Sequence, residues 1–178
     1  VRTTSGEDSV FLASRHGQGI LFSEQDVRSM GRTAAGVFGM RFRDDDELVS
    51  MTVLPKDLMD RVESEDEEVD ERLVVVTEHG YGKRSEIGEF SVQGRGGLGV
   101  IAIKTSDRNG KVVGARLVHD EDELMLITNM GQIIRMGVGG ISIIGRNTQG
   151  VRLMTMDEQE LVVSLARLIP EDEEEEEF

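Results

Sequence analysis

Apolar residues occur in short runs that are separated by glycine-containing turns. Near the end of the chain these runs are LMLIT (124–128), QIIRM (132–136), VRLMT (151–155) and LVVSLARL (161–168). Runs of about four to eight residues rich in Val, Ile, Leu and Met are typical of β-strands, whereas helices usually have ten or more residues. The sequence therefore predicts an all-β fold.

The same pattern occurs three times, in residues 10–54, 73–118 and 124–168. Each copy begins with an apolar run (VFLAS, LVVVT, LMLIT) and then has glycines at three fixed offsets. These are Gly17, Gly80 and Gly131; Gly31, Gly94 and Gly145; and Gly36, Gly99 and Gly150. Four strands in about 45 residues is the size of one propeller blade. We therefore expect a β-propeller-like or β-pinwheel-like array of three four-stranded blades in residues 1–170.

Three blades are too few to close a ring, because propellers usually have about four to eight. An open array also leaves strand edges exposed. We therefore expect these blades to be part of a larger propeller or to associate with another copy. The acidic segment 55–71 separates the first two repeats, and we expect a mobile, partly helical insertion there.

The net charge of -15 is concentrated in two segments. Residues 171–177 carry seven acids, and residues 55–71 carry nine acids against two bases. The rest of the chain has 19 acids and 18 bases, and residues 72–118 hold eight bases against four acids. The acidic total therefore does not exclude a nucleic-acid partner for the basic middle of the chain.

Several stretches of the chain resemble one known family. They include EHGYGKRSEIGEF (78–90), RNGKVVGARLV (108–118) and ISIIGRNTQGVRL (141–153), which are similar to the closing blades of the C-terminal domain of DNA gyrase A. TSGEDSVFL (4–12) and DVRSMGRTAAGVFGMRF (26–42) are similar to the blade before them. The resemblance implies a six-bladed β-pinwheel, of which these three blades are the second half.

The resemblance also implies a function. Such a domain bends duplex DNA around its outer rim and supports ATP-dependent negative supercoiling by a type II topoisomerase. The implied partners are duplex DNA, the core of gyrase A and the gyrase B protein, in the cytoplasm near the nucleoid and away from membranes. ATP and magnesium then act in other parts of the holoenzyme, so no cofactor is expected in this chain.

The family has a diagnostic basic heptapeptide similar to Q-R-R-G-G-K-G, which is expected in its first blade. Residues 93–99 (QGRGGLG) resemble a degenerate copy of it. Gly94 and Leu98 stand where the family has bases, so Arg95 is the only strong cation. We therefore expect weak wrapping by this segment alone. The matching positions are Gln93, Arg95, Gly96, Gly97 and Gly99.

Arginines recur at one position of the repeat. The motif G-R-x-x-x-G-V places Arg32, Arg95 and Arg146 at equivalent points of three blades, where they are predicted to contact phosphates along one rim. The alternative is that each arginine pairs with a carboxylate or binds a turn carbonyl. Four further candidate contacts are Lys83 and Arg84, which follow a glycine turn, and Arg28 and Arg135, which could instead lie on solvated strand faces.

No catalytic or metal site is expected. Tyr81 lies between two glycines at a predicted hairpin turn, which favours a structural or phosphate-binding role over a nucleophilic one. The three histidines are scattered, no histidine or carboxylate spacing fits a metal site, and the chain has no cysteine.

Three interpretations stay open at this point. The acidic tail 171–178 is expected to be disordered, and it acts either as a solubilising end or as a DNA mimic that competes for the basic rim. The related C-terminal domain of topoisomerase IV shares the blades and lacks a strong heptapeptide. A propeller that binds other proteins through its acidic surfaces is the alternative without nucleic acid.

Overall fold

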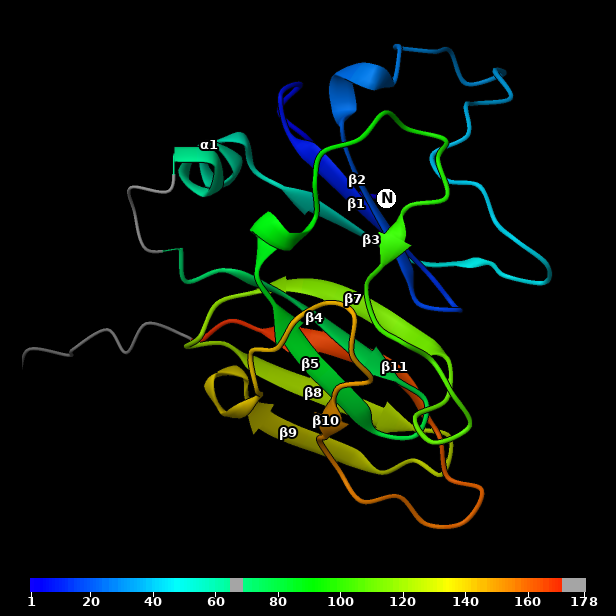
Figure 1. Ribbon diagram of the computed structural model, residues 1–178, viewed down its shortest axis with the longest axis vertical. Helices are drawn as coiled ribbons and strands as arrows, with labels where there is room; N and C mark the ends of the chain where they lie inside the picture. The colour runs from blue at the N-terminus through cyan, green and yellow to red at the C-terminus, as the bar shows by residue number, and fades with distance from the viewer. Residues whose placement is uncertain (65–68, 171–178) are drawn as a thin grey trace, which may run out of the picture.

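The computed structural model describes residues 1–64 and 69–170 (Figure 1). It contains three antiparallel sheets that follow one another along the chain, which confirms the all-β prediction. The strands are β1 (Ser9–Ser14), β2 (Gln18–Ser23), β3 (Leu48–Leu54), β4 (Arg72–Thr77), β5 (Tyr81–Ser85), β6 (Val100–Ile101), β7 (Val112–Val118), β8 (Glu123–Thr128), β9 (Ile133–Gly137), β10 (Val151–Arg152) and β11 (Val162–Leu168). Short 3-10 turns follow β2, β5 and β9: Glu24–Asp26, Ile87–Glu89 and Val138–Gly140.

The sheets differ from the expectation in the origin of their fourth strand. The strand orders are β3-β1-β2-β6, β10-β5-β4-β7 and β11-β8-β9. Strand β6 belongs to the second repeat but pairs with β2 of the first, and β10 of the third repeat pairs with β5 of the second. A short strand from the following repeat therefore completes each of the first two sheets. We call this connection between two blades a joint.

The two ends of the array lack this joint within the described residues. The third sheet has three strands, and Ile133 on its edge strand β9 is 61% exposed. In the first repeat, Val37 and Phe38 occupy the positions of β6 and β10 but belong to no strand, and Phe38 is 76% exposed. The array is thus open at both ends.

Strand β4 lies between two hydrophobic cores. Leu73 and Val75 pack into the core between the first and second blades, and Val74 and Val76 pack into the core between the second and third. This explains the uninterrupted run LVVV, because a strand that is covered on both faces has no position for a polar side chain. Strand β8, in the last blade, instead alternates buried and partly exposed residues.

Part of the acidic insertion is a packed helix. Helix α1 (Lys56–Ser64) buries Leu58 and Met59 against the first core, and Arg61 forms an ion pair with Glu71 at 2.7 Å. Within the described residues, no helix has the length and apolar character that crossing a bilayer requires. Residues 65–68 and the acidic tail 171–178, for which mobility and disorder were expected, lie outside the described residues.

Candidate nucleic-acid interface

We call residues 31–37, 94–100 and 145–151, which carry the G-R-x-x-x-G-V motif, the glycine-arginine loops; the second and third of them connect neighbouring blades. The Nη1 of Arg95 donates to the carbonyl oxygen of Phe38 at 3.0 Å, and the Nη1 of Arg146 donates to the carbonyl oxygen of Ile101 at 3.0 Å. Phe38 and Ile101 occupy equivalent positions in consecutive repeats. In the second and third repeats, the repeated arginine therefore binds its loop to the blade before it.

These contacts leave the charge of both arginines unneutralised. Arg95 uses its Nε for the carbonyl of Asp26 at 2.8 Å and its Nη1 for Phe38, and Arg146 uses only Nη1. Within the described residues neither guanidinium forms an ion pair with a carboxylate. Because a guanidinium has five N–H donors, each arginine keeps several that can reach a phosphate.

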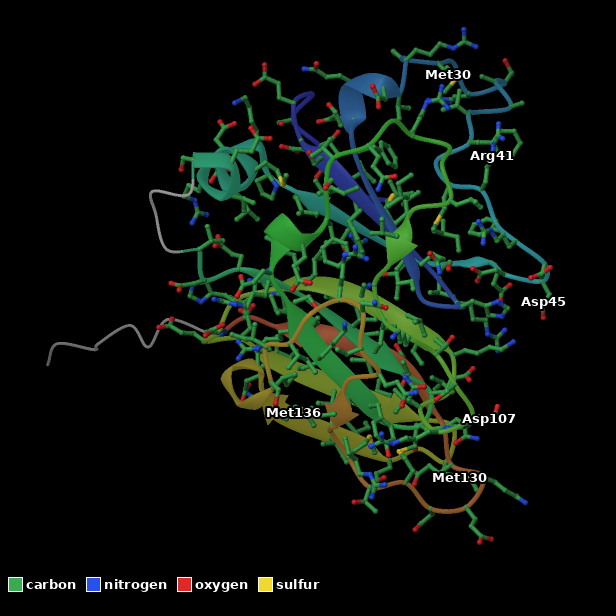
Figure 2. All side chains as sticks on the ribbon, viewed as in Figure 1. Met30, Arg41, Asp45, Asp107, Met130 and Met136 are labelled. Carbon is green, nitrogen blue, oxygen red and sulfur yellow. The ribbon has the colours of Figure 1, made fainter. Side chains whose placement is uncertain are left out.

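A second group of cations lies on the long loop between β2 and β3. Arg28 and Arg32 are exposed, and within the described residues their side chains have no hydrogen-bond partner. The same holds for Arg41, which Figure 2 labels, and for Arg43; neither was among the residues predicted from the sequence. In the sequence RFR (41–43), two arginines flank an aromatic residue, and this pattern could have indicated them. The three aspartates that follow made the segment look acidic. We call these four arginines the loop arginines.

Lys83 is not at the surface. Its side chain is fully buried, and its ammonium donates to the carbonyl oxygens of Gly145 at 2.6 Å and Arg146 at 2.5 Å and to the hydroxyl of Thr148 at 3.2 Å. Lys83 therefore holds the glycine-arginine loop of the third repeat from beneath. The prediction that it lies on the DNA-facing rim is corrected, because all three ammonium donors are in use.

Arg84 is also an interior residue, with 3% exposure. Its Nε donates to the carbonyl of Ile141 at 2.8 Å, its Nη2 to that of Gly139 at 3.1 Å, and its Nη1 pairs with Asp120. The alignment of the repeats contained the signal for this correction. Ile20 and Leu21, which are buried, stand at the positions of Lys83 and Arg84 in the first repeat.

Arg135 stands at the same repeat position as Arg84 but on the edge strand β9. Its side chain is exposed and forms an ion pair with Glu123 on the neighbouring strand. A paired cation releases fewer counterions when it meets DNA, since it is already partly neutralised. Arg135 is therefore a weaker candidate than the loop arginines.

Comparison with known proteins decides the family. The family model described as "DNA gyrase C-terminal domain, beta-propeller" matches residues 8–55, 71–119 and 122–168. The chain belongs to this family. It is 43% identical to DNA gyrase A of Klebsiella oxytoca over 98% of its own length, and 43% identical to that of Escherichia coli (strain K12) over the same share.

Solved structures agree with the family. A DNA gyrase A C-terminal domain superposes with a TM-score of 0.78 at 27% identity, over 92% of this chain and 51% of the other. The C-terminal domain of a DNA topoisomerase IV gives 0.80 at 27% identity, over 93% and 48%. The chain spans about a fifth of the curated gyrase A relatives, 19% for Klebsiella oxytoca and 18% for Escherichia coli.

Residues 93–99, for which the sequence predicted a degenerate heptapeptide, form a joint between the first and second blades. The backbone N–H of Gln93 donates to the carbonyl of Leu21 at 2.8 Å, and that of Gly96 donates to Gly39 at 2.7 Å. Gly97 forms a parallel bridge with Met40. Gly99 has a φ of +71°, and a Cβ there would lie 2.3 Å from the carbonyl oxygen of Gly19. Arg95 is the one member that carries a charge.

Lys83 should make the stability of this family member depend on pH. Burial lowers the pKa of its ammonium from the ordinary 10.5 to about 8. Between these values the unfolded chain binds a proton that the folded chain has released, so the free energy of unfolding rises with pH, by up to about 1 kcal/mol per pH unit. At pH values below about 8, Lys83 is charged in the folded protein, and burial of this charge lowers the free energy of unfolding.

The test of this dependence is urea denaturation of the parent and of Lys83→Met from neutral pH to pH 10.5. Methionine has a similar length and does not titrate, so the variant isolates this one group from the other alkaline titrations. We expect the stability of the parent to rise with pH relative to that of the variant. Parallel profiles of the two proteins would show that Lys83 has an ordinary pKa in the fold.

Proposed function

We propose that this chain is a DNA-binding segment of gyrase A, part of a type II topoisomerase, and that it bends duplex DNA along its basic loops. The observation that carries the proposal is the group of cations without carboxylate partners on equivalent loops of consecutive blades: Arg32, Arg95 and Arg146, together with the other loop arginines. Phosphate contacts of this kind give affinity without sequence preference.

The family and the gyrase names of its relatives support this proposal. In it, the remaining four fifths of gyrase A, together with the gyrase B protein, supply strand cleavage and ATP hydrolysis. The chain itself supplies no catalytic group, and its bending of DNA helps the enzyme introduce negative supercoils. In the same proposal the blades described here are the second half of a six-bladed ring, since the chain covers 51% of a solved gyrase A domain.

Topoisomerase IV is the second candidate. Its solved C-terminal domain superposes with a TM-score of 0.80, and the heptapeptide of this chain has a single strong cation. The proposed gyrase role requires that the domain constrain a wrap of DNA. Closure of nicked plasmid in the presence of the chain measures this, because a wrapping domain changes the linking number and a domain that only binds does not.

The DNA-binding test removes the four loop arginines together, as Arg28→Gln, Arg32→Gln, Arg41→Gln and Arg43→Gln. Within the described residues these side chains have no bonds, so the fold should be unaffected. Fluorescence anisotropy with labelled duplexes should show affinity falling by about 10–100-fold at about 50 mM salt. The slope of log K against log salt should shrink by about 0.9 for each phosphate that is no longer neutralised.

The matched control is Arg135→Gln, which removes one exposed cation that is already paired with Glu123. We expect its affinity for DNA to stay close to that of the parent. Two duplexes of unrelated sequence should behave alike, since phosphates carry no sequence information. An unchanged affinity in the fourfold variant contradicts the interface, and no binding by the parent at low salt favours a protein partner instead.

A further inference from the structure

Tyr81 lies between two arginines from different repeats. It begins β5, it is 5% exposed, and it pairs with Arg152 of β10 across the joint between the second and third blades. Its hydroxyl oxygen accepts hydrogen bonds from the Nη2 of Arg152 at 3.1 Å and the Nε of Arg108 at 3.4 Å. The two guanidinium carbons lie 5.6 and 5.0 Å from the centre of its ring.

This arrangement brings two positive charges to one neutral hydroxyl. Arg108 and Arg152 are exposed, and neither forms an ion pair with a carboxylate among the described residues. Arg15, which is partly exposed, and Arg72, which is mostly buried, each contact two carboxylates. Two like charges that converge without an anion repel each other, and a bound anion would relieve that repulsion.

The free donors at this point suit an oxyanion. Each guanidinium uses one N–H for Tyr81 and keeps others in a planar fork that matches the geometry of phosphate. The Tyr81 hydroxyl accepts from both arginines, and its own proton has no acceptor among the described residues. Three groups can therefore donate to one bound oxyanion.

The loop that carries Arg108 is held in place. Asn109 is fully buried, and its Nδ2 donates to the carbonyls of Lys104 at 2.8 Å and Gln149 at 3.1 Å. The Nδ1 of His79 lies 3.2 Å from the carbonyl oxygen of Arg108. Figure 2 labels Asp107 on this loop, at the periphery of the molecule. A site built on such a loop loses little conformational entropy when it binds a ligand.

We propose that Tyr81, Arg108 and Arg152 form a binding site for a phosphate group, either a phosphodiester of nucleic acid or free inorganic phosphate. None of the three belongs to the loop arginines or to the glycine-arginine loops, so the site does not depend on the proposed interface. The hydrogen bonds from Arg152 and Arg108 also lower the pKa of Tyr81, as expected for a hydroxyl in a positive field. Bound phosphate should raise that pKa again.

The chain provides its own probe, because Tyr81 is the only tyrosine and there is no tryptophan. Its ring resonances in an NMR spectrum at neutral pH therefore report on this site. Addition of inorganic phosphate, at an ionic strength kept constant with sodium chloride, should shift them in a saturable way. Arg108→Gln and Arg152→Gln should each weaken the binding about tenfold, the usual effect of removing one charge-assisted hydrogen bond. Arg135→Gln should bind like the parent.

A second measurement is the alkaline titration of tyrosinate absorbance, whose midpoint should rise with phosphate and not with chloride. A short duplex distinguishes the two sources. If the duplex shifts the Tyr81 resonances in the fourfold loop-arginine variant as well, the ligand is a phosphodiester; if only inorganic phosphate does, it is the free ion. Equal effects of phosphate and chloride, or no shift with either phosphate or duplex, overturn the proposal while leaving the loop arginines untouched.

Discussion

Replacement of Gly99 by alanine is expected to lower the free energy of unfolding by about 2–5 kcal/mol. Two causes add: a φ of +71° costs an L-residue about 1–2 kcal/mol, and overpacking costs about 1–3 kcal/mol. The overpacking arises because the new methyl group would lie 2.3 Å from the carbonyl oxygen of Gly19. Backbone cannot move aside as a flexible side chain can, so the joint between β2 and β6 must open.

The repeat provides a matched control for this experiment. Gly36 stands at the same repeat position with a φ of +85°, but a Cβ there meets nothing within 4 Å. Gly36→Ala should therefore cost only the backbone term of about 1–2 kcal/mol. Urea denaturation followed by circular dichroism measures both variants. Equal losses of stability in the two would contradict the conclusion that close approach at the blade joint makes glycine necessary at position 99.

Replacement of Arg84 by alanine is expected to lower the free energy of unfolding by about 3–6 kcal/mol, because it removes two hydrogen bonds from a charged donor to carbonyls, each of which contributes about 1.5–3 kcal/mol. The change leaves the carbonyls of Ile141 and Gly139 without their donor and Asp120 without one of its two cations. Gly139 and Ile141 belong to the turn after β9 and Asp120 to the turn before β8, so the third blade should loosen first. Hydrogen exchange of the amides in residues 138–144 would show this directly.

Arg135→Ala is the control, since Arg135 holds the equivalent position in the third repeat with an exposed side chain. Exposed ion pairs contribute about 0–1 kcal/mol, so its stability should differ little from that of the parent. A similar small effect in Arg84→Ala would mean that solvent reaches the guanidinium and that Arg84 is available for DNA. The pair of variants thus also tests the correction made to the predicted interface.

Local sequence was sufficient for the strands and for the repeat. The runs VFLAS, LVVVT and LMLIT each contain most of a strand, β1, β4 and β8, because short apolar runs that are followed by glycine-containing turns are typical of strands. The repeated arginine was found in the same way. Its carbonyl partner lies in the preceding repeat, 57 residues away for Arg95 and 45 for Arg146, and no local pattern indicates such a contact.

Local sequence could not show that Lys83 and Arg84 are buried. Lys83 and Arg84 follow a glycine turn and form a basic pair, which is typical of an exposed hairpin. The loop of the third repeat covers them, and carbonyls of that loop and of the turn before it replace water as acceptors. Arg108 and Arg152 are likewise 44 residues apart in sequence and meet only because β10 crosses to β5.

The amino-acid sequence by itself determined the all-β class, the three repeats, the family resemblance and the glycine positions, because these follow from local periodicity and from backbone conformations that only glycine readily adopts. The tertiary structure decided which strand completes each sheet and which cations face solvent. Both depend on contacts between repeats: a crossing strand takes its hydrogen bonds from the neighbouring blade, and a cation is buried or exposed according to whether the next blade covers it.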